Sequence, residues 1–153
     1  MSTLADHFLR FYGGFADKRI KASSSDRAIK IDDRTEFDRS PVFCSMFVRV
    51  TGPTQLELSI TNLPLDEHVR KSLTSLRAKI AEMDYGNQVE IPITLKSAKR
   101  LRRLATQVRR IVGRGRRYAD PNWKWICPRT ARSLNRLATF LDQLPMDCRC
   151  PTS

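Results

Sequence analysis

Residues 42–61 read VFCSMFVRVTGPTQLELSIT, two runs of strand-forming residues on either side of a short turn. In the second run Leu56, Leu58 and Ile60 alternate with polar residues, which is the pattern of a strand with one buried face. Gly52 and Pro53 lie in the turn, where these residue types are common. We therefore predict a β-hairpin of residues 42–50 and 55–61, joined by a four-residue loop.

A helix and a third strand are predicted to follow the hairpin. Thr61 or Asn62 is the expected cap of this helix, and Pro64 is expected in its first turn. The apolar stripe at helical spacing comprises Val69, Leu73, Leu76, Ile80 and Met83. Alternation over residues 89–95 then indicates a strand, and Pro92 predicts that this strand lies at the sheet edge or pairs on one side only.

The chain before the hairpin contains one clear helical pattern. Leu4, Phe8, Phe11 and Phe15 are spaced by four, three and four residues, so a short helix with a buried aromatic side is predicted from Ser2 or Thr3 to Gly13 and Gly14. The segment 17–41 is polar, and only residues 28–31 are expected to form a brief edge strand.

A strongly basic helix is predicted over about residues 97–112. Its apolar residues share one narrow side: Leu101, Leu104, Ala105, Val108, Ile111 and Val112. The opposite side carries Lys99, Arg102, Arg103, Thr106, Arg109 and Arg110. Gly113 and Gly115 are expected to end this helix and to open a basic loop that contains Arg114, Arg116 and Arg117.

A last helix is predicted with Pro128 in its first turn, after a short strand or extended segment of residues 123–126. Its apolar side is formed by Ala131, Leu134, Leu137, Ala138, Leu141 and Leu144, and another side by Arg129, Arg132 and Arg136. Together these elements predict an α+β fold, with a small antiparallel or mixed sheet of about three strands and four helices. With 153 residues, one domain over residues 1–147 is expected, followed by an exposed tail, residues 148–153.

The charge of the chain is concentrated in its last part. Residues 1–90 hold thirteen Lys and Arg against thirteen Asp and Glu, whereas residues 91–153 hold fifteen against three, so the formal net charge of +12 arises after residue 90. No acidic residue lies between Glu90 and Asp120. A surface of this kind attracts polyanions, because no internal carboxylate neutralises it.

These observations favour a DNA-binding or RNA-binding protein without catalysis, which recognises mainly the phosphate backbone. The predicted nucleic-acid-binding residues are Lys99, Arg102, Arg103, Arg109, Arg110, Arg114, Arg116, Arg117, Trp123, Lys124, Arg129, Arg132 and Arg136. Trp123 or Trp125 would add base stacking if exposed, although a core position is the commoner fate of tryptophan.

Two alternatives remain open from the sequence. The basic surface is also suited to an acidic surface of a partner protein, which the chain would bind or inhibit. A metal-dependent nuclease would need the carboxylates of Asp32, Asp33, Glu36 and Asp38, but a solvated turn with local ion pairs explains that cluster better. The 16-residue spacing of the two basic helices argues against a helix-turn-helix, and the RNP, KH and P-loop patterns are missing from the sequence.

No cofactor is expected. Cys127, Cys148 and Cys150 have spacings that fit zinc poorly, because zinc sites draw on paired ligands with two to four residues between them. The sequence contains no apolar run long enough to predict a membrane span or a signal peptide, so we expect a location in the cytoplasm, or in the nucleus of a eukaryotic cell.

Overall fold

The hairpin is the centre of the sheet in the computed structural model. Strand β3 (Ser45–Val50) pairs with β4 (Gln55–Thr61), and Val48 lies opposite Leu58. Alternate residues of both strands are buried on the same face, as the sequence pattern predicts. The structure describes residues 3–15, 20–32, 45–84, 86–114 and 123–145, apart from the side chains of residues 32 and 125.

The sheet has six antiparallel strands in the described residues, so the prediction of about three strands is wrong. The additional strands and the predicted third strand are β1 (Ile20–Ser23), β2 (Ala28–Asp32), β5 (Lys79–Met83) and β6 (Gly86–Thr94). Their spatial order is β1-β2-β3-β4-β6-β5. Strand β2 is longer than the predicted edge strand and lies inside the sheet, where it pairs with both β1 and β3.

The prediction that the strand of Pro92 lies at the sheet edge or pairs on one side only is wrong, because β6 pairs with both β4 and β5. Pro92 itself has a strand partner on one side only. It lies opposite Glu57 of β4, whereas the pairing of β6 with β5 ends at Glu90. Proline has no N–H to donate, and β5 has no residue opposite Pro92 that would require such a donor.

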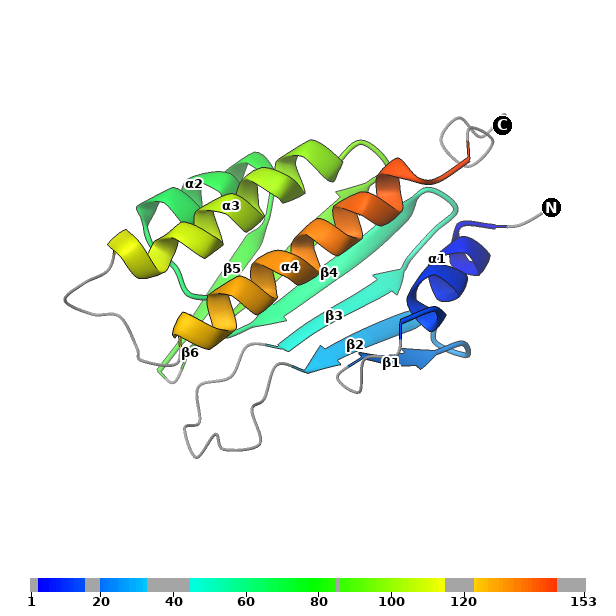
Figure 1. Ribbon diagram of the computed structural model, residues 1–153, viewed down its shortest axis with the longest axis horizontal. Helices are drawn as coiled ribbons and strands as arrows, with labels where there is room; N and C mark the ends of the chain where they lie inside the picture. Colours follow the sequence, from blue (N-terminus) through cyan, green and yellow to red (C-terminus); the bar gives the residue numbers. More distant parts are fainter. Residues whose placement is uncertain (1–2, 16–19, 33–44, 85, 115–122, 146–153) are drawn as a thin grey trace.

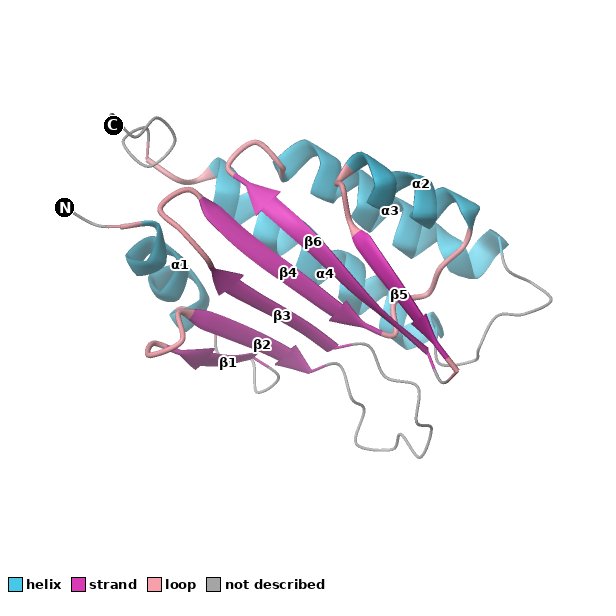
Figure 2. Ribbon diagram, turned by 180° about the vertical axis from the view of Figure 1, so that it is seen from behind, coloured by secondary structure: helices cyan, strands magenta, loops and turns pink. Residues whose placement is uncertain are grey.

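Four helices belong to the described part of the chain: α1 (Leu4–Gly13), α2 (Glu67–Ser75), α3 (Ala98–Arg114) and α4 (Trp123–Asp142). Helix α3 lies beside α4, and α2 lies beside α3 (Figure 1). They cover one face of the sheet, while the other face is left open (Figure 2). The fold is α+β, with one hydrophobic core between these two layers.

Helix α1 has the predicted bounds. Thr3 caps it in a capping box, in which its hydroxyl accepts from the Asp6 N–H and the Asp6 carboxylate accepts from the Thr3 N–H. Phe8 is fully buried and meets Phe140 of α4 edge to face, with 5.6 Å between the ring centroids. Phe15 is an exception to the predicted aromatic burial, because 36% of its surface is exposed.

The predicted helix over residues 62–83 is wrong at both ends. Asp66, and not Thr61 or Asn62, is the N-cap of α2, and the helix stops at Ser75. Arg77 adopts a positive φ of 58°, and the Ala78 N–H donates to the Leu73 carbonyl at 3.0 Å. This is the hydrogen-bond pattern of a Schellman motif, so Ile80 and Met83 belong to strand β5 and not to a helical stripe.

The predicted extended segment before the last helix is also wrong. Helix α4 begins at Trp123, and Pro128 lies inside it. Ile126 and Cys127 are buried in the core, so the helix gains apolar contacts for more than a turn before the proline. Helix α3 likewise continues through Gly113 to Arg114.

None of the helices in the described ranges combines the length and apolar character that crossing a membrane requires.

Candidate nucleic-acid interface

Helix α3 separates its apolar and charged residues onto opposite sides. Leu101, Leu104 and Val108 are fully buried, and they face the core beneath the helix. Lys99, Arg103 and Arg110 are exposed. Spacings of four and seven residues place these three on one line along the outer side of the helix.

Helix α4 continues this surface. Lys124 and Arg132 are exposed, whereas Leu134 and Leu137 are fully buried. Because α3 and α4 are neighbours on the same face of the sheet, the exposed sides of both helices point away from it (Figure 1).

Six exposed cations of α3 and α4 together form what we name the basic face. They are Lys99, Arg103, Arg109, Arg110, Lys124 and Arg132. Within the part of the chain that the structure describes, none of the six forms an ion pair. Their charge is therefore available to an external anion.

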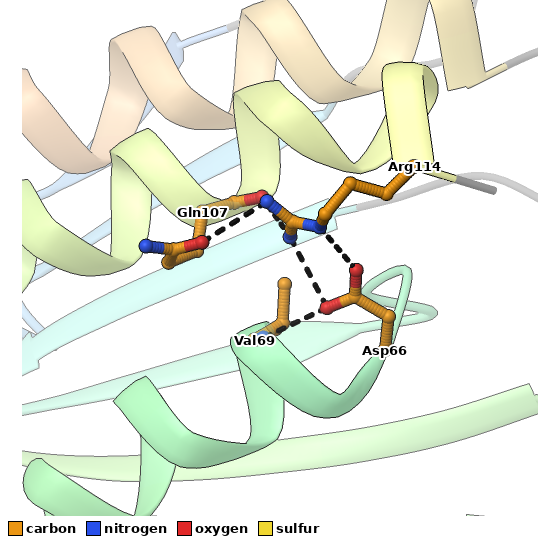
Figure 3. A network of polar contacts seen from close by, with 4 residues as sticks. All are labelled: Asp66, Val69, Gln107 and Arg114. Atoms are coloured by element: carbon orange, nitrogen blue, oxygen red, sulfur yellow. Dashed lines mark hydrogen bonds and ion pairs between the residues drawn. The ribbon is translucent and has the colours of Figure 1, made fainter.

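Two predicted binding residues are engaged by carboxylates. Arg102 forms an ion pair with Asp142 at 2.5 Å, which joins α3 to α4. Arg114 Nε donates to Asp66 Oδ2 at 2.7 Å, and Arg114 Nη2 donates to Asp66 Oδ1 at 3.2 Å (Figure 3). The same guanidinium donates to the side-chain and backbone oxygens of Gln107, so Arg114 joins the end of α3 to the start of α2.

The environment of Asp66 favours its charged form. Partial burial alone would raise the pKa of Asp66, but hydrogen bonds from Arg114 and the Val69 N–H, together with the Arg114 charge, hold it below its usual value of 3.8. Asp66 therefore caps α2 and anchors Arg114 as a carboxylate.

The remaining predicted residues differ in their surroundings. Trp123 is half-buried against the core and borders a hollow of about 380 Å³ together with Arg70 and Met83. Arg136 is half-buried, and its guanidinium carbon lies 4.2 Å from the centroid of the Phe15 ring, within cation–π distance. Arg129 is half-buried in the same helix. Arg116, Arg117 and the Trp125 side chain lie outside the described residues.

Metal ligation has no support within the described ranges, where His, Cys, Asp and Glu form no group of three or more that could hold an ion. Cys127 is fully buried, and burial, with a smaller effect of the Asp66 charge, raises its pKa to about 12. It is therefore a protonated core thiol at neutral pH. Cys148, Cys150 and the acidic side chains of Asp32, Asp33, Glu36 and Asp38 lie outside the described residues.

Sequence reasoning did not select three cationic or titratable residues beside the basic face. His68 and Lys71 of α2 and Arg100 of α3 border a groove between these helices. Their spacing along each helix was visible in the sequence, but the position of α2 beside α3 was not.

Comparison with known proteins gives no match: no family model, curated protein or solved structure is similar to this chain at a significant level.

Proposed function

We propose that this protein binds DNA or RNA through its basic face, without catalysis. The observation that carries the proposal is the exposure of six cations on two neighbouring helices, none of them paired with a carboxylate in the described residues. Each phosphate that such a cation contacts releases condensed counterions, and this release supplies binding free energy whatever the base sequence. The proposal includes the expected location, the cytoplasm or nucleus, because DNA and RNA occur there.

The dimensions of the basic face suit a phosphate backbone. Lys99 and Arg110 are eleven residues apart on one helix, about 16 Å at 1.5 Å per residue. This length equals the axial rise of about five base pairs at 3.4 Å each. Several phosphates can therefore lie within reach of α3 while Lys124 and Arg132 contact others.

Electrophoretic mobility shifts with single-stranded and duplex oligonucleotides of DNA and RNA test the proposal. With six phosphates contacted, we expect the affinity to fall by about 10³-fold or more between 50 and 200 mM salt. Absence of binding by every oligonucleotide at 50 mM salt would reject the function. Binding to an acidic protein without binding to nucleic acid would instead support the alternative partner.

A pair of charge-reversed variants tests the surface. Arg103→Glu with Arg110→Glu changes the basic face, whereas Lys21→Glu with Lys30→Glu makes the same change of four charge units on the open face of the sheet. The first variant should make the fall of log affinity with log salt less steep, with a slope smaller in magnitude by about 2, since two phosphate contacts are lost. Equal losses in both variants would show that net charge, and not this face, determines binding.

A further inference from the structure

The groove between α2 and α3 has a volume of about 200 Å³ and is lined entirely by polar side chains. Helix α2 contributes His68, Lys71, Ser72 and Ser75, which share one side of the helix because they are spaced by three, one and three residues. Helix α3 contributes Arg100, Arg103 and Gln107 at spacings of three and four residues. Polar side chains of the two helices therefore face each other across the groove.

The groove is positively charged. Lys71, Arg100 and Arg103 line it, and no carboxylate is among the residues that line it. Among the acidic groups on or near α2, Asp66 is held by Arg114, and Glu82 of β5 forms an ion pair with Arg70. Glu67, in the first turn of α2, is exposed and is not among the residues that line the groove. The three cations form no ion pair within the described chain.

The Asp66–Arg114 ion pair fixes the orientation of the Gln107 side-chain amide at the groove. Arg114 Nη1 donates to the Gln107 side chain at 3.0 Å, and a guanidinium has only donors, so the amide atom facing it must be the oxygen. The amide nitrogen of Gln107 consequently points away from Arg114 (Figure 3). Gln107 can therefore present N–H donors to a ligand in the groove.

We infer that this groove binds one phosphate group of a nucleic-acid backbone, an inference that rests on the proposed function. Guanidinium, ammonium, amide N–H and hydroxyl groups are all hydrogen-bond donors, and they match a ligand that is anionic and has only acceptor oxygens. Arg103 lines the groove and also belongs to the basic face. A backbone that crosses the basic face would thus place one of its phosphates between α2 and α3.

Nuclear magnetic resonance of the full chain with inorganic phosphate tests the site directly. At constant ionic strength set with sodium chloride, phosphate should shift the backbone amides of Ser72 and Arg103 and the side-chain amide of Gln107. The same signals should move when an oligonucleotide is added. Phosphate shifts spread evenly over all arginines, with none concentrated at the groove, would overturn the inference.

Affinity measurements test the connection with nucleic acid. Lys71→Ala with Arg100→Ala should reduce the salt slope of duplex binding by about 1, as expected for one lost phosphate contact. Lys21→Ala with Lys30→Ala removes the same charge from the open sheet face and should leave the slope unchanged. All four residues are exposed and have no hydrogen bond or ion pair between side chains in the described residues, so both variants should fold.

The outcomes separate the two proposals. If the wild type binds oligonucleotides and both double variants keep its slope, the groove inference is wrong and the basic face remains. If the wild type binds no oligonucleotide while inorganic phosphate still shifts the groove signals, the proposed function fails, and the inferred nucleic-acid source of the phosphate fails with it.

Discussion

Gly86, at the start of β6, has a backbone conformation that other residues rarely adopt. Its φ is +152°, and a Cβ built at this position would overlap Oδ1 and Cγ of Asn62. Asn62 cannot easily move, because its Oδ1 accepts from the Asn87 N–H and its own φ is 59°. We predict that Gly86→Ala lowers the free energy of unfolding by about 1–3 kcal/mol, measured by urea titration.

Gly113 provides the matched control for this prediction. It lies in helix α3, and a Cβ there would have no atom within 4 Å. Gly113→Ala should therefore raise the free energy of unfolding by roughly 0.5–1 kcal/mol, because alanine favours a helix. If Gly113→Ala raises the free energy of unfolding while Gly86→Ala leaves it unchanged, the Asn62 side chain moves aside at little cost and the prediction for Gly86 is wrong.

Single residues also show what sequence reasoning can and cannot identify in the candidate site. The exposed positions Lys99, Arg103 and Arg110 follow from helical periodicity, which is a local property. The partner of Arg114 does not, because Asp66 is 48 residues away in the chain and reaches it only when α2 lies beside α3. The charge of a side chain is thus visible in the sequence, whereas its neutralisation depends on tertiary structure.

At the level of whole elements, the Asp66–Arg114 contact joins the N-terminus of α2 to the C-terminus of α3. Since the pKa of Asp66 in the folded protein is lowered, the carboxylate contributes stability above its usual value of 3.8, and this contribution is lost as the pH falls through the folded value. We predict that Asp66→Asn costs about 1 kcal/mol at pH 7, with asparagine still able to cap the helix. The difference from the wild type should shrink as the pH falls below 3.8, measured by urea unfolding between pH 7 and pH 2.5.

Arg114→Gln is the companion variant for this contact. This variant leaves Asp66 in place but removes the guanidinium that stabilises the carboxylate. Its free energy of unfolding should therefore change less between pH 7 and pH 2.5 than that of the wild type. A difference between Asp66→Asn and the wild type that stays constant across the pH range would mean that the ion pair contributes nothing measurable.

The errors in the predicted elements arise where the local pattern is misleading or weak. Ile80 and Met83 continue the helical spacing of Val69, Leu73 and Leu76, so periodicity alone does not reveal where α2 ends. The usual signal would be a glycine in the left-handed conformation, but Arg77 takes that place. Strand β1 is short and only partly buried, so it has no strong alternating pattern. Tertiary pairing, and not local preference, creates it.

On the scale of the whole molecule, the two parts of the sequence contribute unequally to the two layers, although α2 of the first part lies beside α3 in the helical layer. The charge-balanced residues up to position 90 form most of the sheet, and the basic residues after it form α3 and α4 above one sheet face (Figure 1). The open face is different in character, because Arg49 of β3 lies opposite Glu57 of β4 and forms an ion pair with it. The asymmetry of charge along the chain could be read from the sequence, but its assignment to a face required the sheet order.

The unpaired cations of the basic face should lower the stability of the free protein, because like charges on one helix repel each other. Arg103 lies four residues from Lys99 and three residues from Arg100 on α3, and each pair of like charges costs roughly 0.2–0.5 kcal/mol at low salt. Arg103→Gln with Arg110→Gln removes both repulsions and retains good helix formers. We therefore predict that this variant is more stable than the wild type by about 0.5 kcal/mol in 10 mM NaCl, although it binds nucleic acid less tightly.

Salt distinguishes repulsion from any other cause of this gain. In 1 M NaCl the screening length falls to about 3 Å, so the repulsion between these exposed side chains is largely removed and the two proteins should be equally stable. Urea unfolding at both salt concentrations measures the effect, since urea carries no charge of its own. If the variant is still more stable than the wild type in 1 M NaCl, the gain comes from helix propensity or packing. If the variant is less stable than the wild type in 10 mM NaCl, the cations of the basic face stabilise the free protein, and the predicted repulsion is wrong.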